Sequence, residues 1–323
     1  MSTQRYSLPN TAQQSTMELG IGKLGALGAP ALRNLAFLIG ASAGGNKAAR
    51  VHNIARQAAL LDKLQGPSVT FTSIDTGVVN LAVASVTCNT SDATPTLTYW
   101  DKTNLEQRYR GGEQLALTPS DTAPLASVLA RDLQCTPELR NTSLFTIEKQ
   151  RTRTVGSSAV SDPILKLNVM EHLIFAQLAQ LAHRNIVSSD PGRMTKYWVP
   201  REREVQTGLK SKRLRVDLVR QLVLGGPSPL LKLQGGIATK VRTYNETPRR
   251  GRIPSLFDAL QLVEPLNGVR KDDDLTDSLL HALAWAQWYM TYTDMKRCMA
   301  LDTAQLADFI EARYARWEAE TMI

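Results

Sequence analysis

The chain has 323 residues, of which 43% are hydrophobic and 21% charged, so it is long enough to bury the core of one large domain or two modest ones. Its three cysteines lie far apart and form no CxxC pair, which excludes a disulfide framework and a zinc ribbon as the expected class. No apolar run approaches the roughly 20 residues that a membrane span requires. The net charge of +8 indicates a polyanionic partner.

The basic charge is concentrated in two parts of the chain. Residues 192–252 hold fifteen basic and four acidic side chains, a net charge of +11, and residues 1–66 have a net charge of +5. The stretches 67–191 and 253–323 have net charges of −2 and −6. A run of charges is usually only a solvated face, but an excess of this size favours contact with phosphates. The basic segment 192–252 is therefore the expected place of polyanion binding.

The first 66 residues are expected to form a leader and a helical module. Residues 1–27 have no apolar segment typical of a secretory signal, and we interpret them as a flexible leader. Residues 30–40 are predicted as a short helix, because Pro30 suits its first turn and Gly40 its end. Residues 47–64 carry apolar side chains at helical spacing and form a second predicted helix. The helical module thus spans 28–66, and residues 67–323 are expected to form a larger domain.

After Gly66 the pattern changes to the alternation that is typical of strands. Three strands are predicted at 68–75, 78–88 and 95–101, and together they indicate an antiparallel meander. A helix at 121–134, a short apolar strand at 142–148 and a long amphipathic helix at 163–183 follow.

The remaining elements lie in the basic segment and the acidic C-terminal part. Residues 196–200 (KYWVP) are interpreted as a strand and 211–224 as a helix. Glycine-rich turns are expected at 225–226 and 235–236, and a basic loop at 243–252. Two final helices are predicted at 274–299 and 303–321. A meander followed by alternating strands and helices predicts an α/β fold, in which helices flank a mixed sheet.

Acidic side chains stand at the ends of the predicted elements. Asp75 ends the first strand, where a glycine two residues later permits a tight turn, and Glu148 ends the fourth strand. Asp277 lies near the start of the helix at 274–299, with Asp273 and Asp274 four and three residues before it. Each acid alone has an ordinary explanation as a turn, edge or helix-start residue. Their joint placement predicts that they converge on one point.

Converging carboxylates repel one another unless a cation lies between them. Mg²⁺ prefers such oxygen ligands, and Mn²⁺ is a suitable substitute. Two such ions roughly 4 Å apart can hold the attacking and leaving oxygens of a phosphodiester displacement. The spacing leaves the fourth acid open: a spacing of four from Asp277 selects Asp273, which we favour, and a spacing of three selects Asp274. Asp274 is also the better candidate for the helix N-cap, and a carboxylate engaged in capping is less free to bind metal.

This order of elements, with these acids, resembles the RNase H/integrase superfamily. The segments SIDTGVVNLAVA, TIEKQRTRT and KDDDLTDSLLHALAW are similar to the fungal mitochondrial Holliday-junction resolvases, the cruciform-cutting relatives of bacterial RuvC. The segment LRNLAFLIGASAGGNKAARVHNI resembles the SAP-like helical module that precedes the nuclease in that family; its marks are Leu32, Leu35, Gly40, Gly45 and Lys47. The resemblance spans about residues 28–299.

The resemblance implies an RNase H-like nuclease domain at 67–323 that resolves four-way DNA junctions by metal-dependent phosphodiester hydrolysis. It implies that Asp75, Glu148 and Asp277 are catalytic metal ligands, joined by Asp273 or, at a RuvC-like spacing, Asp274. It also implies a homodimer that makes paired cuts, with no membrane or small-molecule partner. The location implied is the mitochondrial matrix, with mitochondrial DNA.

Basic side chains beside the acids and in the basic segment are the expected DNA contacts. Arginine binds phosphate through two parallel hydrogen bonds, and a lysine at a helix start suits a phosphate ligand. The candidates are Lys47, Lys149, Gln150, Arg151, Arg153, Lys210, Lys212, Arg213, Arg215, Lys240, Arg242, Arg249, Arg250 and Arg252.

Two other functions remain as alternatives. An actin- or hexokinase-like ATP-binding protein also opens with a DxG hairpin, but it needs a further phosphate-binding hairpin together with a glycine-rich adenosine motif, which we do not expect here. A non-catalytic junction-binding protein on a decayed nuclease fold would not be expected to keep the three acids.

Two further features lie on the helix at 274–299. His281 follows Asp277 by four residues and is placed either beside the acids or in helix packing. The aromatic stripe of Trp285, Trp288, Tyr289 and Tyr292 is expected to pack in the core or at a dimer face, with base stacking as the less favoured alternative.

Overall fold

The structure is a computed structural model, and two compact units can be distinguished in it, one of residues 1–64 with 287–323 and one of residues 65–286. The structure describes residues 22–64, 66–77, 79–89, 92, 94–113, 118–150, 161–182, 185–200, 204–205, 207, 209–247, 253–262, 271–298 and 302–321. Most of the expected leader therefore lies outside the described residues. The boundaries expected at residues 27 and 66 stay predictions, and the grouping of residues 287–323 with the N-terminal helices is a feature that we did not expect.

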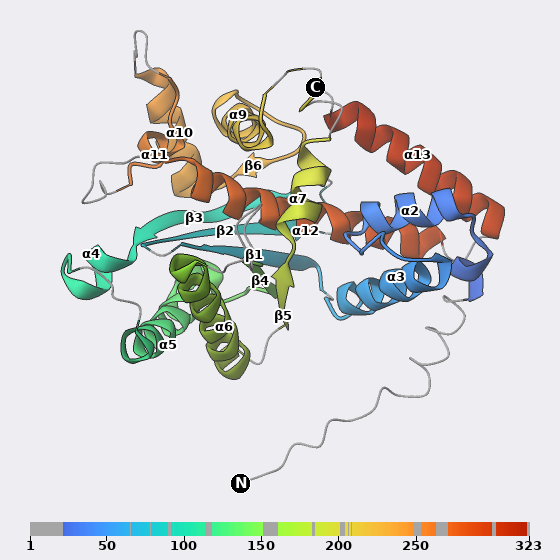
Figure 1. Cartoon of the computed structure of the whole chain (residues 1–323). Helices are drawn as coiled ribbons and strands as arrows, with labels where there is room; N and C mark the ends of the chain where they lie inside the picture. The colour runs from blue at the N-terminus through green and yellow to red at the C-terminus, as the bar shows by residue number, and fades with distance from the viewer. Residues whose placement is uncertain are drawn as a thin grey trace. The chain divides into compact units, whose positions relative to one another are not determined.

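The unit of residues 65–286 is built on one six-stranded sheet (Figure 1). Its strands are β1 (Ser68–Thr76), β2 (Asn80–Asn89), β3 (Thr96–Asn104), β4 (Leu144–Glu148), β5 (Asn185–Ser189) and β6 (Lys232–Leu233), and their order across the sheet is β5-β4-β1-β2-β3-β6. The first three strands pair antiparallel, as the predicted meander requires, whereas β4 pairs parallel with β1 and β5 parallel with β4. This mixed sheet flanked by helices confirms the predicted α/β fold class, while the SAP-like assignment of the N-terminal helices stays a prediction.

Helices cover both faces of this sheet (Figure 1). The predicted helices α5 (Pro119–Cys135) and α6 (Asp162–Ala182) pack on one face, where Ile74 and Ile147 join a buried apolar cluster. Because side chains alternate along a strand, the next residues, Asp75 and Glu148, point to the opposite face. α12 (Asp273–Cys298) begins on that face, since Nε1 of Trp100 on β3 donates to a carbonyl oxygen in its first turn at 3.0 Å.

The turn between β1 and β2 is as tight as its glycine suggested. The N–H of Gly77 donates to the carbonyl oxygen of Asn80 at 2.7 Å. A Cβ atom at position 77 would lie only 2.8 Å from that same oxygen, closer than real Cβ contacts allow. Glycine is therefore required here, and the close turn fixes the end of β1 that carries Asp75.

The strand predicted at 196–200 is wrong. Most of this stretch lies in α7 (Pro191–Trp198), which begins because the Asp190 side chain accepts a hydrogen bond from the Arg193 N–H at 2.8 Å and Pro191 occupies the first turn. The strand that extends the sheet beside β4 is instead β5, at residues 185–189.

The basic segment contains more helix than its glycines suggested. α9 (Ser211–Leu224) matches the predicted helix, but the turn expected at 235–236 is the start of α10 (Gly235–Glu246). That helix also takes up residues 243–246 of the expected basic loop, and residues 248–252 lie outside the described part of the chain. The remaining short elements are α4 (Leu105–Arg110), the 3₁₀ turn η1 (Pro137–Leu139) and α11 (Leu256–Ala259).

The other unit contains α2 (Ala29–Leu38), α3 (Lys47–Leu61), the last turns of α12, and α13 (Thr303–Thr321), which confirms the helices predicted there. Gly40 ends α2 with a φ of 72°, and a Cβ atom on it would lie 2.3 Å from the indole ring of Trp288. Phe37 meets the ring of Trp317 edge to face at a centroid distance of 4.5 Å. The aromatic rings of α12 and α13 are therefore partners of the N-terminal helices.

The aromatic stripe of α12 is part of the core, as expected. Trp285, Trp288 and Tyr292 are all buried, and the hydroxyl of Tyr289 donates to the carbonyl oxygen of Leu64 at 3.1 Å. Buried rings with partners inside the protein are not free to stack on bases. A search of the described helices for a segment long and apolar enough to cross a membrane finds none.

Candidate metal centre

Three acids, from β1, β4 and α12, converge where the strands β1 and β4 end. β1 and β4 run parallel with Ile74 opposite Ile147, so the residues that follow, Asp75 and Glu148, are neighbours on the face toward α12. Asp277 lies one turn inside α12 on the same side. One carboxylate oxygen from each of these three residues lies within 4.8 Å of the other two. The structure therefore brings together the acids that the sequence placed at element ends.

Burial and mutual repulsion of the three carboxyl groups raise the electrostatic free energy of the folded chain. Burial raises the pKa of Asp75 well above its usual value, and the neighbouring negative charges raise it further, in the order Glu148, Asp274, Asp277 and Asp273. Burial likewise raises the pKa of Asp277 from 3.8 to about 6, although the Arg215 charge opposes the shift. Groups that resist ionisation in this way are stabilised by a cation placed among them.

The donor set fits a hard divalent cation. Glu148 Oε2 and Asp277 Oδ1 are buried and accept no well-formed hydrogen bond from any residue that the structure describes. A nitrogen lies beside each oxygen, His281 Nε2 at 3.4 Å from Glu148 Oε2 and Arg215 Nε at 2.9 Å from Asp277 Oδ1, but each carboxylate oxygen keeps lone pairs for a metal ligand. All the converging atoms are oxygens, which Mg²⁺ and Mn²⁺ prefer, and the partial exposure of the three acids leaves room for water ligands.

Basic side chains surround the acids, and two of them come from α9. Arg215 Nε lies 2.9 Å from Asp277 Oδ1, and Nη1 of the same guanidinium donates to the Thr195 hydroxyl at 2.8 Å. Lys212, one turn earlier, forms a short ion pair with Asp273. From the sheet, Nζ of Lys102 lies 2.7 Å from Asp274 Oδ2, and its side chain is only 7% exposed.

Lys102 is a residue of this site that the sequence analysis missed. A signal was present, because Lys102 follows Trp100 by two residues on β3 and therefore shares its face of the sheet. That face is the one covered by α12. Arg215 was assigned to DNA contact as part of a charge cluster, whereas in the structure its guanidinium contacts an acid of the metal centre.

Asp273 and Asp274 are the two candidates for a fourth acid, and the proposal that Asp274 caps the helix is wrong. α12 begins at Asp273, so Asp274 is its second helical residue and does not precede the helix. Both carboxylates have a lysine partner. Although burial opposes it, hydrogen bonding and charge from Lys212 hold the pKa of Asp273 below its usual value. Asp274 raises the pKa of Asp75 more than Asp273 does, which indicates that its charge acts more strongly on the cluster.

Two side chains near the acids, Glu171 and Gln150, make contacts that the sequence analysis did not predict. Glu171 on α6 is buried, its pKa is raised by burial, and it accepts the Gln150 N–H at 2.9 Å. The Gln150 side-chain amide in turn donates to the carbonyl oxygen and hydroxyl of Thr76, at 3.2 and 3.3 Å. Gln150, expected to contact DNA, thus connects the ends of β4 and β1 inside the protein. An acid within the apolar pattern of the helix at 163–183 was the available signal for Glu171.

The other expected DNA contacts are exposed where the structure describes them. Lys149 follows Glu148 at the end of β4, and the candidates of the basic segment lie on or just before α9 and on α10. The exposed residues are Lys149, Lys210, Lys212, Arg213, Lys240 and Arg242. Arg151, Arg153, Arg249, Arg250 and Arg252 lie outside the described residues.

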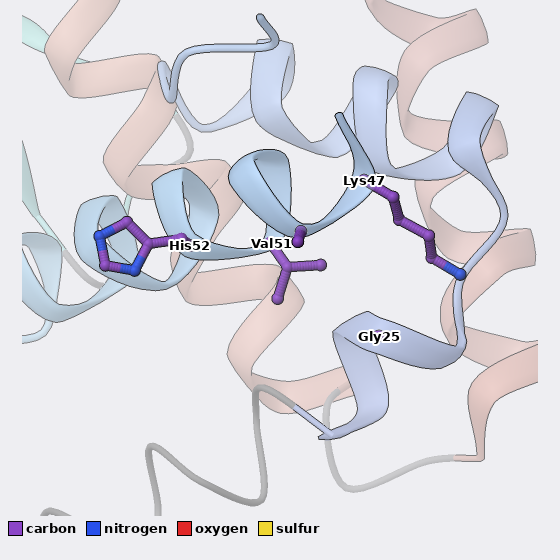
Figure 2. Close-up of a pocket in the computed structure, with 5 residues that line it drawn as sticks. Gly25, Lys47, Val51 and His52 are labelled. Carbon is purple, nitrogen blue, oxygen red and sulfur yellow. The ribbon is translucent and has the colours of Figure 1, made fainter. Parts of the chain in front are cut away.

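Lys47 belongs to the other unit and lies at an open hollow of about 510 Å³ (Figure 2). Asn46 caps α3 by accepting the Ala49 N–H at 2.9 Å, so Lys47 is the first helical residue, as its proposed role requires. Val51 and His52 of the same helix and Gly25 also line the hollow. The lysine is exposed and available to a phosphate.

Comparison with known proteins agrees with this geometry. Residues 71–295 match the family described as "Mitochondrial resolvase Ydc2 / RNA splicing MRS1". Over 308 residues, 86% of each chain, the sequence is 31% identical to "Cruciform cutting endonuclease 1, mitochondrial" from Saccharomyces cerevisiae. The fold is similar to that of the crystal structure of the yeast mitochondrial Holliday junction resolvase Ydc2, with a TM-score of 0.57 and 20% identity over 84% of this chain and 98% of that one. The match over most of the chain shows that this protein belongs to the mitochondrial resolvase Ydc2 / RNA splicing MRS1 family.

Proposed function

We propose that the protein is a structure-selective endonuclease that resolves four-way DNA junctions with a divalent metal, Mg²⁺ in the cell and Mn²⁺ as a substitute. The observation that carries the proposal is the convergence of Asp75, Glu148 and Asp277 within 4.8 Å. The relative with 31% identity is named as a cruciform cutting endonuclease, which supports the same substrate class.

The acids and their basic neighbours have separate tasks in this proposal. Asp75, Glu148 and Asp277 would hold the metal, with Asp274 or Asp273 as the fourth acid. A bound divalent cation supplies Lewis-acid stabilisation for a phosphodiester displacement. Arg215 favours the ionised form of Asp277, which is the form that binds a cation. Lys149, exposed at the end of β4 beside Glu148, would contact a phosphate of the strand that is cut.

The family description also names RNA splicing, and the acid cluster favours the nuclease. A protein that only binds nucleic acid has no use for three converging carboxylates whose mutual repulsion destabilises the fold. The same cluster argues against a decayed nuclease. The family match argues against the actin-like ATP-binding alternative.

A homodimer with paired cuts follows from the symmetry of the substrate. An open four-way junction has two-fold symmetry, and a two-fold dimer presents one metal centre to each of two equivalent strands. The mitochondrial relative supports a location in the mitochondrial matrix. Sedimentation of the purified protein, together with the ratio of singly to doubly cut junctions, tests the dimer directly.

The main test is cutting of a synthetic four-way junction by wild type and Asp75→Asn, with and without Mg²⁺. We expect Asp75→Asn to bind the junction as the wild type does but to lose cutting, because binding depends on dispersed basic side chains. Asp162→Asn is the matched control, since that acid is 70% exposed at the start of α6. Cutting by Asp75→Asn at the wild-type rate, or metal-independent cutting by the wild type, would refute the proposal.

A further inference from the structure

A buried line of polar groups runs from the interior to the metal centre. His281 is one helical turn beyond Asp277 on α12 and is 0% exposed. Its Nδ1 atom lies 2.7 Å from the hydroxyl oxygen of Ser189, and its Nε2 atom lies 3.4 Å from Glu148 Oε2. Trp285, one turn further along α12, donates its indole N–H to the same Ser189 oxygen at 2.9 Å. The line therefore reads Trp285, Ser189, His281, Glu148.

The donors in this line fix where the imidazole proton lies. An indole nitrogen only donates, so the Ser189 oxygen accepts from Trp285. Among the described residues, the other neighbour of that oxygen is Nδ1 of His281, so the serine hydroxyl has this nitrogen as its acceptor. A neutral imidazole that accepts at Nδ1 carries its proton on Nε2. That proton faces Glu148.

A hydrogen-bond donor beside Glu148 would fix the orientation of this carboxylate as a metal ligand. Metal-binding carboxylates are themselves commonly hydrogen-bonded, and that second contact sets their orientation. Glu148 Oε2 is buried and accepts no well-formed hydrogen bond from the described residues, and His281 Nε2 likewise makes none, although the two atoms are only 3.4 Å apart. The two atoms therefore face each other as a donor and an acceptor.

We propose that His281 is a positioning residue for the metal centre: with its proton held on Nε2 by Ser189 and Trp285, it orients Glu148 as a metal ligand. The inference rests on the proposed function, because it assumes that Glu148 binds the metal. It adds three buried residues to the site, His281, Ser189 and Trp285. It also assigns a task to Ser189, which terminates β5 directly opposite Glu148 on β4.

The first test measures Mn²⁺ binding to the metal-free protein without DNA, by titration calorimetry or by the EPR signal of free Mn²⁺. We expect His281→Leu to weaken binding about 10- to 100-fold, as loss of a supporting partner typically does. His281→Gln should recover part of the loss, because its amide places a donor near the position of Nε2. Ser189→Ala should also weaken binding, because the imidazole proton is then free to move to Nδ1. Ser278→Ala, a buried serine on the same helix that donates to the Leu275 carbonyl, is the matched control and should bind as the wild type does.

The outcomes separate this inference from the proposed function. If the wild type binds Mn²⁺ and both His281 variants bind equally well, the positioning role is wrong while the metal centre stands. If the wild type and Asp75→Asn both fail to bind Mn²⁺, the metal centre itself is wrong and this inference falls with it.

A second test does not depend on metal. The chain has four histidines, so ¹⁵N-histidine labelling gives a simple spectrum of ring nitrogens, and the signals lost in His281→Gln identify His281. We expect the pattern of a ring that accepts at Nδ1 and carries its proton on Nε2 in the wild type, and a shift away from that pattern in Ser189→Ala. A ring protonated on Nδ1 in the wild type would overturn the proposal.

Discussion

Arg215 contacts both carboxylate oxygens of Asp277: Nε lies 2.9 Å from Oδ1, and a terminal nitrogen donates to Oδ2 at 3.2 Å. Even this partner does not offset burial and the neighbouring charge of Glu148, since the pKa of Asp277 remains raised, at about 6. Without a metal, ionisation of Asp277 at neutral pH therefore lowers the stability of the folded chain. This relationship gives a prediction with a definite sign.

In a chelating buffer near pH 7, Asp277→Asn should be more stable than the wild type, by up to about 3 kcal/mol. The pKa of Asp277 is about 6 in the folded chain against 3.8 for the ordinary group, so the folded state holds the proton more tightly. Its contribution to the stability of the wild type is therefore greatest in acid and falls as the pH rises from about 4 to about 6. Urea unfolding of both proteins across this range measures the difference, which should vanish near pH 4.

Adding Mg²⁺ provides the control for this prediction. The cation should raise the melting temperature of the wild type and leave that of Asp277→Asn nearly unchanged. A wild type that is already the more stable protein in chelator at neutral pH would contradict the prediction.

Asp272, the residue before α12, is predicted to hold the basic segment to this helix. Its carboxylate is 5% exposed and accepts hydrogen bonds from the Arg220 guanidinium at 2.7 and 3.1 Å and from the backbone N–H groups of Leu256 and Phe257, both at 3.1 Å. Asp272→Ala leaves a largely buried arginine and two N–H groups without this acceptor, so it should cost roughly 3–5 kcal/mol of unfolding free energy. Asp217→Ala, which removes the more exposed acid near Arg220, should cost less than about 1 kcal/mol in the same urea measurement.

The fourth acid can be decided by single-turnover cutting of a junction by two variants. Asp274 acts more strongly than Asp273 on the pKa of Asp75, so we now expect Asp274→Asn to lose orders of magnitude in rate. Asp273→Asn should retain more activity, because the ion pair of Asp273 with Lys212 is the contact that the variant loses. This expectation reverses the preference for Asp273 that the sequence analysis gave. Loss of cutting in Asp273→Asn with an active Asp274→Asn would restore that preference.

Junction affinity should fall steeply with salt. If the basic side chains neutralise about 6–10 phosphates, affinity should drop roughly 10³- to 10⁵-fold between 50 and 200 mM salt. Lys240→Ala and Arg242→Ala, at exposed positions of α10, should each lower the logarithmic salt slope by about 1. Lys166→Ala, on α6 at the opposite face of the sheet from the acids, should leave the slope unchanged in the same binding titrations.

The elements that carry the three acids were predictable, because strong local patterns define them. β1 and β4 are apolar strands that end in an acid, and strand alternation alone sends Asp75 and Glu148 to one face. The helix of Asp277 has a long apolar sequence. What these elements share is that neighbouring residues in the chain decide their conformation.

The features that the sequence analysis missed or got wrong depend on contacts between residues far apart in the chain, or on a single helix-capping side chain. The helix at 191–198 exists because of the Asp190 side chain, which a search for apolar alternation ignores. Lys102 and Asp274 are 172 positions apart in the chain, and no local pattern connects them. Lys212 carries the same charge whether it contacts a phosphate or Asp273, so only the structure reveals the ion pair.

The close approach of Gly40 to Trp288 bears on how the chain is made. The helical unit is interrupted by residues 65–286, so the sheet unit is in effect an insertion between its two halves. During synthesis α2 and α3 leave the ribosome first, but the indole ring that covers Gly40 arrives only after the whole insertion has been translated. Likewise, Phe37 meets the ring of Trp317 only after the last segment has been translated. A chaperone that shields apolar helix faces is the kind of assistance such a delay calls for.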